Sequence, residues 1–209
     1  MINTTTYTDI ANFALDQIGG FNIQDINDSN NPNAILCKRH IGRCVKAELD
    51  KYEWTCARKF KKPVAVDLEA NPDAYIKGYI AYHLPEDFSR LSQYFFSEYY
   101  PYRKNQYDLG HNYFLTADYL YTKHPLETLA YCSNKVPIAK WNQLMCDVMA
   151  AALAKSIARK IAGTDADVAF VDALYRSAVS DARRHQVLQM EPSGTGMTES
   201  QMSRVLYYG

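Results

Sequence analysis

Three side chains that commonly bind metals stand at helical spacing in the first quarter of the sequence: Cys37, His40 and Cys44. Their separations would place all three near one face of a helix, where they could point at a single metal ion. A structural zinc site needs four ligands, usually in Cys-x-x-Cys or His-x-x-x-His pairs, and no such pair occurs in this sequence. We therefore expect Cys37 and Cys44 to be small core residues and His40 to lean toward the surface, with no metal and no other cofactor required.

Two groups of carboxylates are candidates for catalysis. Glu86 and Asp87 follow Pro85, where a turn commonly collects acids, and adjacent residues on a strand point to opposite faces. The second group lies mostly at the start and on the solvated face of a predicted helix; it comprises Asp165, Asp167, Asp172 and Asp181. No phosphate-binding glycine loop, Gly-x-Ser-x-Gly or His-Glu-x-x-His motif occurs. The sequence predicts no catalytic residues and no enzymatic activity, with an enzyme that uses the acids of the last helix as a remote alternative.

Basic residues on the last two predicted helices form a possible nucleic-acid stripe; they are Lys155, Arg159, Lys160, Arg176, Arg183 and Arg184. Acidic residues interrupt this stripe, and mixed charge is typical of the outer face of a helical bundle. We interpret the stripe as a solvated surface. A small DNA-binding or packaging-associated protein remains an alternative of a different class, and its binding to DNA would weaken steeply with salt.

Composition narrows the functional classes further. The 209 residues carry 23 basic and 23 acidic side chains, so no net field draws the chain to nucleic acid or to an anionic membrane. No segment approaches the roughly 18 apolar residues of a membrane span, and the N-terminus lacks the features of a signal peptide. The five cysteines form no spaced framework, so reduced thiols are expected. We predict a protein that is made and kept in a cytosol and has no membrane partner.

Apolar periodicity predicts helices at both ends of the sequence. Residues 7–18 repeat at helical spacing and are followed by Gly19 and Gly20, which supply a stop. The next helix has Asn31 as its cap and Pro32 at its first position. The helical period returns at residue 137, is broken at Gly163, and continues to residue 190.

The penultimate predicted helix is rich in alanine. The short side chains of these alanines let a second helix approach closely, either within the subunit or from a neighbouring one. These residues are Ala150, Ala151, Ala152, Ala154 and Ala158.

The middle third of the sequence has the period of β-strands. Aromatic and branched residues alternate in short runs between residues 62 and 132. The predicted fold is therefore α+β and mainly α: a four-helix bundle with an inserted antiparallel β lobe and an extended C-terminal tail. The predicted domains are residues 1–61 and 133–191 for the bundle, 62–132 for the β lobe, and 192–209 for a flexible tail.

Two segments carry more apolar or aromatic surface than a loop needs. The tail begins as a Gly, Ser and Pro linker and yet ends in Val205, Leu206, Tyr207 and Tyr208. The loop of the β lobe carries Tyr99, Tyr100 and Tyr102. Exposed side chains of this kind invite association unless a partner covers them. We therefore predict that these seven residues bind protein partners.

Five segments, in this order, resemble the tail tubular protein A, or head-to-tail adaptor, family of short-tailed bacteriophages. They are "ALDQIGGFNIQDI", "NPNAILCKRHIGRCVKAELDKYEWTCARKF", "YHLPEDFSRL", "FLTADYLY" and "PIAKWNQLMCDVMAAALAKSIARKIAGTD". The resemblance covers about residues 7 to 60 and 82 to 190. Its most specific features are a helix that ends in Gly-Gly, a helix that finishes at a Trp, an "LPxD" turn and an alanine-rich helix.

The resemblance implies a structural role in a virion. Proteins of this family form a dodecameric ring between the portal protein of the filled head and the tail nozzle protein, and DNA passes through the ring without being read. This chain would then be assembled in the host cytoplasm and reside at the head–tail junction of the virion, where it takes part in DNA ejection. A head completion or stopper ring protein at the same junction is the closest alternative.

Overall fold

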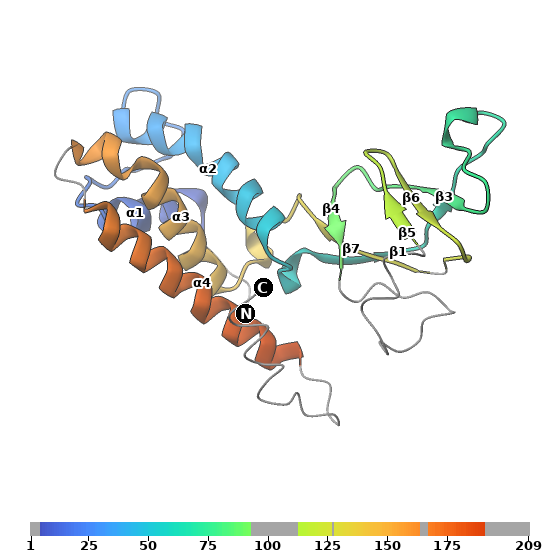
Figure 1. Ribbon diagram of the computed structural model, residues 1–209. Coiled ribbons are helices and arrows are strands. Elements are labelled where there is room, and N and C mark those ends of the chain that lie inside the picture. The colour runs from blue at the N-terminus through green and yellow to red at the C-terminus, as the bar shows by residue number, and fades with distance from the viewer. Residues whose placement is uncertain (1–4, 93–112, 127, 164–166, 191–209) are drawn as a thin grey trace. The chain divides into compact units, whose positions relative to one another are not determined.

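The computed structural model describes residues 5–92, 113–126, 128–163 and 167–190 (Figure 1). Its fold is mixed α+β and divides into two compact units. The helical unit comprises Met1–Cys56 and Val136–Gly209, and the β unit comprises Ala57–Lys135. Four α-helices occur among the described residues: α1 (Tyr7–Asp16), α2 (Pro32–Lys51), α3 (Gln143–Ile161) and α4 (Val168–Met190). None of them combines the length and the apolar character needed to span a bilayer.

Local signals in the sequence fix both ends of α1. At its start the Thr6 hydroxyl accepts a hydrogen bond from Asp9 N, while the Asp9 carboxylate accepts one from Thr6 N at 2.8 Å. This reciprocal pair satisfies backbone donors that the first turn leaves open. Past its end, Gly19 adopts a left-handed φ of 68°, a conformation that costs a glycine little. The predicted stop at the glycine pair is confirmed.

The start of α2 also follows the prediction, whereas the start of α3 does not. Asn31 Oδ1 accepts hydrogen bonds from Asn33 N and Ala34 N, and Pro32 occupies the first turn. The helix expected from residue 137 begins later, because Ile138–Lys140 forms a short 3-10 turn. Asn142 then caps α3 by accepting a hydrogen bond from Met145 N at 2.8 Å. An N-cap ahead of a helix marks its start better than apolar periodicity does.

Helix α3 is the core of the helical unit. Each of α1, α2 and α4 packs against it, whereas contact between α1 and α2 is slight. The five alanines of its small-residue stripe are all buried within this unit. Their short side chains therefore serve helix packing inside the subunit. The described residues show three helices gathered on a central one, and a closed four-helix bundle remains a prediction.

The described residues of the β unit form two antiparallel sheets, and an antiparallel β lobe is what the sequence predicts. One has the order β1-β7-β4, made by β1 (Arg58–Lys61), β7 (Leu129–Ser133) and β4 (Phe88–Leu91). The other has the order β2-β3-β6-β5, made by β2 (Val64–Ala65), β3 (Ile80–His83), β6 (Tyr119–Thr122) and β5 (Tyr113–Leu115).

Residues 58–61 were expected in the helical bundle, and this expectation is wrong. They form β1, which pairs with β7 from Arg58 opposite Cys132 to Lys61 opposite Leu129. The strand begins directly after the 3-10 turn Thr55–Ala57. Alternation of Arg, Lys and Phe is compatible with a strand at a sheet edge, where one row of backbone groups is unpaired.

Alternating residues of β3 and β6 fill two separate cores of the β unit. Tyr82 and Leu120 are cross-strand partners on one face of the sheet, and Ala81 and Tyr121 are partners on the other. Adjacent residues of a strand point to opposite faces, so each strand contributes to both cores. The Tyr82 hydroxyl accepts a hydrogen bond from Leu126 N at 3.0 Å, which satisfies its polar end inside the first core.

Candidate functional site

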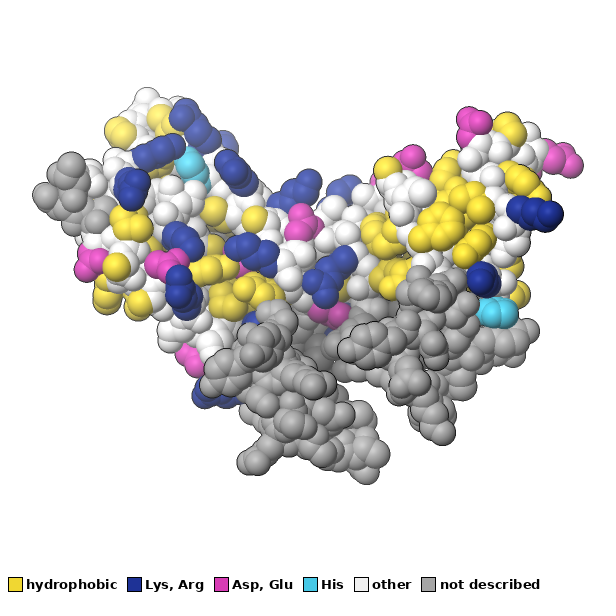
Figure 2. Space-filling model, viewed as in Figure 1, with side chains coloured by type: hydrophobic (Ala, Val, Ile, Leu, Met, Phe, Trp, Pro, Cys, Tyr) yellow, Lys and Arg dark blue, Asp and Glu magenta, His cyan; other side chains and the backbone are white. Residues whose placement is uncertain are grey.

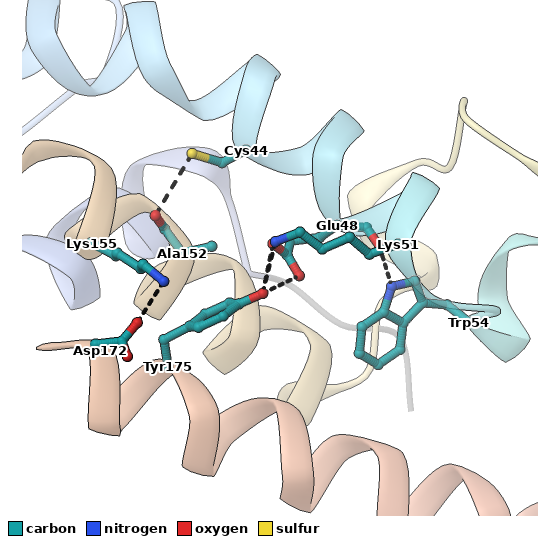
Figure 3. A network of polar contacts seen from close by, with 8 residues as sticks. All are labelled: Cys44, Glu48, Lys51, Trp54, Ala152, Lys155, Asp172 and Tyr175. Carbon is teal, nitrogen blue, oxygen red and sulfur yellow. Dashed lines mark hydrogen bonds and ion pairs between the residues drawn. The ribbon is translucent and has the colours of Figure 1, made fainter. Parts of the chain in front are cut away.

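A polar network in the helical unit joins α2 to α4 (Figure 3). Glu48 is 2% exposed, and both of its carboxylate oxygens lie 3.0 Å from the Tyr175 hydroxyl, which donates to the carboxylate. Lys51 Nζ donates to Glu48 Oε1 at 2.7 Å and to the Tyr175 hydroxyl at 2.9 Å. Two donors thus compensate a carboxylate that would otherwise be costly to bury.

Burial and hydrogen bonds shift the pKa values in this network. Burial alone would lower the pKa of Lys51, but its hydrogen bonds to Glu48 and Tyr175 raise it. Burial, together with the neighbouring Glu48 carboxylate, raises the pKa of Tyr175 to about 12 despite the opposing effect of Lys51. Tyr175 is therefore protonated at neutral pH and acts as a hydrogen-bond donor, which suits a structural clamp between helices.

A second set of contacts ties α3 to α4 beside this network. Lys155 Nζ lies 2.5 Å from Asp172 Oδ1, and Arg176 lies 2.6 Å from Asp172 Oδ2. The Lys155 ammonium also lies 4.8 Å from the centre of the Tyr175 ring, a cation–π arrangement. The alternative that Asp172 takes part in metal binding or catalysis thus gains no support, because its oxygens bind two cations.

The remaining acids of that group have different positions. Asp167 Oδ1 accepts a hydrogen bond from Phe170 N at 2.8 Å and so stabilises the start of α4. Asp181 is exposed on α4, and Asp165 lies outside the described residues. Asp167, Asp172 and Asp181 therefore do not assemble into one site.

The candidate metal ligands Cys37, His40 and Cys44 do not converge on one point. Cys37 is buried in the core, and Cys44 Sγ lies 3.8 Å from the carbonyl oxygen of Ala152 on α3. His40 is half-buried between the helices, where its Nδ1 contacts Ser156 Oγ at 2.7 Å. Across the described ranges no group of three His, Cys, Asp or Glu side chains is placed to hold a metal ion.

Asp87 of the "LPEDF" turn is the centre of a polar network in the β unit. Its carboxylate accepts hydrogen bonds from the Tyr131 hydroxyl at 2.9 Å and the Ser133 hydroxyl at 2.7 Å, and forms an ion pair with Lys59. Burial alone would raise its pKa, but these three donors lower it to about 2. Asp87 therefore fastens the turn before β4 to β7 and β1. Glu86 instead lines a shallow open pocket beside it.

The basic stripe expected on the last two helices separates into two groups. Lys155 and Arg176 are occupied by Asp172, and the Arg183 guanidinium lies 5.2 Å from the centre of the Tyr52 ring. Arg184 is exposed on α4. The second group is Arg159 and Lys160, both exposed near the end of α3, and Lys160 Nζ lies 3.0 Å from His40 Nε2 on α2.

Helix α2 adds three cations to this second group that the sequence reasoning did not single out. Together they form a surface that we call the basic face, and all of its members are exposed: Arg39, Arg43, Lys46, Arg159 and Lys160. Figure 2 shows Lys and Arg side chains gathered on this part of the helical unit beside a histidine. The spacing of the three α2 cations already predicts that they share one side of that helix. The sequence does not show that cations of α3 lie next to them.

The β unit presents large apolar side chains on its surface. Phe60 on β1 is 60% exposed and Val64 on β2 is 57% exposed, and both strands are edges of their sheets. Tyr75, in the segment between β2 and β3, is 61% exposed. Exposed apolar residues at open sheet edges are typical of surfaces that pair with another chain.

The partner-binding residues predicted from the sequence lie outside the described residues. These are Tyr99, Tyr100, Tyr102, Val205, Leu206, Tyr207 and Tyr208. The exposed residues Phe60, Val64 and Tyr75 were missed, because alternation alone does not show which face of a strand is covered.

The sequence matches no protein-family model, and no curated protein matches it. The resemblance to head-to-tail adaptors remains a prediction.

Proposed function

We propose that this protein is a structural component of a virion, one subunit of a ring-shaped adaptor between the capsid portal and the tail nozzle. In this role the ring is dodecameric, has no catalytic activity, and forms a conduit through which DNA passes during ejection. The helices of each subunit close into a four-helix bundle, and the β unit and the tail reach the neighbouring components.

The observation that carries this proposal is the exposed apolar surface of the β unit. Phe60 and Val64 stand on two open edge strands, and neither is covered by another described part of the same unit. A single copy in water gains nothing from keeping such side chains exposed, whereas a subunit of an assembly can bury them against a neighbour. The contrast with the well-packed core around α3 favours an interaction protein over an enzyme.

The segments that carry the resemblance also have defined structural roles. The Gly-Gly step ends α1, and the segment that finishes at Trp54 is α2 with its C-terminal extension. Trp54 Nε1 donates to Glu48 O at 2.8 Å, so the residue after α2 is anchored to the helix itself. The alanine-rich segment is the buried helix α3. These segments of the resemblance therefore coincide with helices and helix ends of this chain.

The tail hypothesis gives the proposal a direct test. We propose that Leu206, Tyr207 and Tyr208 fill apolar pockets on the portal or on an adjacent subunit. Each buried side chain contributes about 1.5 to 3 kcal/mol at best, and repetition around a ring makes later attachments effectively intramolecular. Deletion of residues 204–209 should therefore weaken binding to portal-bearing capsids and leave thermal unfolding of the body unchanged.

The control for this deletion replaces residues 195–200, in the linker, by an equally long Gly-Ser segment. This variant should attach as the full chain does. Unchanged attachment of the deletion variant would refute the tail hypothesis, and a large fall in its thermal stability would mean that the tail packs on its own body.

A further inference from the structure

We propose that the basic face, formed by Arg39, Arg43 and Lys46 of α2 with Arg159 and Lys160 of α3, binds the phosphate backbone of duplex DNA without reading its sequence. This inference deepens the proposed function and rests on it, because it names the surface that meets DNA in transit.

The first argument is the absence of acidic residues from the parts of α2 and α3 that carry the basic face. Residues 31–47 and 148–163 contain no Asp or Glu, although the chain as a whole is neutral. Among the described residues, no acid forms an ion pair with any member of the basic face. A cluster of cations in a neutral chain is a local feature, and its positive potential favours an anionic ligand.

The second argument is the spacing of the cations. Arg39, Arg43 and Lys46 stand at i, i+4 and i+7, so they form one exposed stripe along α2. The stripe is about 10 Å long at 1.5 Å per residue. One DNA strand carries a phosphate about every 3.4 Å of helix axis, so the stripe covers the length of about three phosphates. Lys160 of α3 lies beside this stripe, and Arg159 is its exposed neighbour in the sequence.

The third argument is the arrangement of side chains where α2 and α3 meet. An ammonium group can only donate hydrogen bonds, so His40 Nε2 accepts from Lys160 Nζ at 3.0 Å. The ring is then neutral, with its proton on Nδ1, which donates to Ser156 Oγ at 2.7 Å. Burial, together with the nearby charges of Lys160, Arg39 and Arg43, lowers the pKa of His40. Cations and a hydroxyl thus lie together where α2 and α3 meet, and no carboxylate of the described residues contacts them there. Cations and hydroxyls are groups that commonly contact DNA phosphates.

The composition of the face favours DNA over an acidic protein partner. The centres of protein interfaces are rich in aromatic side chains, and the basic face contains no aromatic or large apolar residue. The nearest exposed large apolar residue along α2 is Ile35, one turn before Arg39. Because the face has no apolar anchor, its affinity for a partner must come from charge. DNA is a dense polyanion and therefore gains the most from such a surface.

The test compares two triple variants of the full chain that lose the same charge. One is Arg39→Gln, Arg43→Gln, Lys160→Gln on the basic face. The matched control is Arg176→Gln, Arg183→Gln, Arg184→Gln on α4. Binding to a labelled duplex of arbitrary sequence and about 20 base pairs is followed by fluorescence anisotropy between about 50 and 200 mM NaCl. Circular dichroism confirms that both variants fold.

We expect the basic-face variant to bind the duplex about tenfold more weakly at low salt. The slope of the logarithm of its association constant against the logarithm of the salt concentration should be smaller in magnitude by about 2 to 3. The control variant should keep the slope of the unmodified chain. In the unmodified chain, addition of DNA should raise the pKa of His40, measured by NMR, because phosphates offset the cations around it. The basic-face variant should still attach to portal-bearing capsids, which separates this inference from the proposed function.

Three results would overturn the inference. The first is no measurable binding of the duplex by the unmodified chain, and the second is an equal loss of binding in both triple variants. The third is competition by polyglutamate as effective as competition by DNA at equal charge concentration, which would assign the face to an acidic protein surface. Failure of every variant and of the unmodified chain to attach to capsids would instead refute the proposed function.

Discussion

Replacement of Tyr175 by Phe removes one hydroxyl from the centre of the network between α2 and α4. That hydroxyl donates to Glu48 and accepts from Lys51, so Tyr175→Phe leaves the Glu48 carboxylate with Lys51 as the remaining partner in this network. Glu48 is 2% exposed, so water cannot replace the lost donor easily. Loss of a hydrogen bond to a buried charged group costs about 1.5 to 3 kcal/mol.

The phenylalanine ring at position 175 should keep the cation–π contacts of the tyrosine ring. Lys51 Nζ and Lys155 Nζ lie 5.2 Å and 4.8 Å from the centre of the Tyr175 ring, and Phe preserves that face. The expected change therefore comes from the hydroxyl alone. We predict that Tyr175→Phe lowers the free energy of unfolding of the helical unit by about 2 kcal/mol.

Urea unfolding followed by tryptophan fluorescence measures this change in the correct unit. The chain has two Trp residues, Trp54 and Trp141, and both are buried in the helical unit. The control is Tyr75→Phe, at an exposed position of the β unit, which should change stability by less than about 0.5 kcal/mol. A double-mutant cycle with Lys51→Met isolates the interaction between the two side chains. A loss below about 0.5 kcal/mol for Tyr175→Phe would show that the network does not stabilise the helices.

Two further predictions concern the turn before β4 and the glycines. The folded pKa of Asp87, about 2, lies below its ordinary value of 3.8, so its contribution is fully present above about pH 3.8 and is lost as pH falls through about 2. That contribution is at most about 2 kcal/mol, and Asp87→Asn should remove this part of the acid dependence of β-unit unfolding; an unchanged acid profile would contradict it. Gly19→Ala should destabilise the helical unit by about 1 kcal/mol because Gly19 has a φ of 68°, whereas Gly42→Ala, inside α2 and in open space, should stabilise it by about 0.5 to 1 kcal/mol. Equal effects of the two substitutions in thermal unfolding would contradict the assignment of these backbones.

The helices could be predicted from local signals in the sequence. Features that depend on contacts between distant residues could not be predicted in this way. Asn31, Pro32 and the Gly19–Gly20 pair act within a few residues of their own position, so the sequence shows their effect directly. The switch into β1 was misplaced because the pairing of Arg58 with Cys132 depends on a strand far along the chain. Short polar strands carry little signal of their own.

The polar network of the candidate site also depends on contacts between residues far apart in the sequence. Glu48 and Tyr175 meet across 127 residues of sequence, and no spacing rule brings them together. The basic face was missed for a related reason, because Arg39 and Lys160 become neighbours only when α2 packs on α3. The absence of acids from residues 31–47 is visible in the sequence, but it does not show that Lys160 of a distant helix lies beside them.

The most direct test of the adaptor proposal is electron microscopy of the purified protein mixed with capsids that carry their portal but no tail. The proposal predicts a closed ring of this protein at the portal vertex, with the β units of adjacent subunits covering Phe60 and Val64. Capsids with a bare portal vertex at saturating protein, or protein bound evenly over the shell, would contradict it.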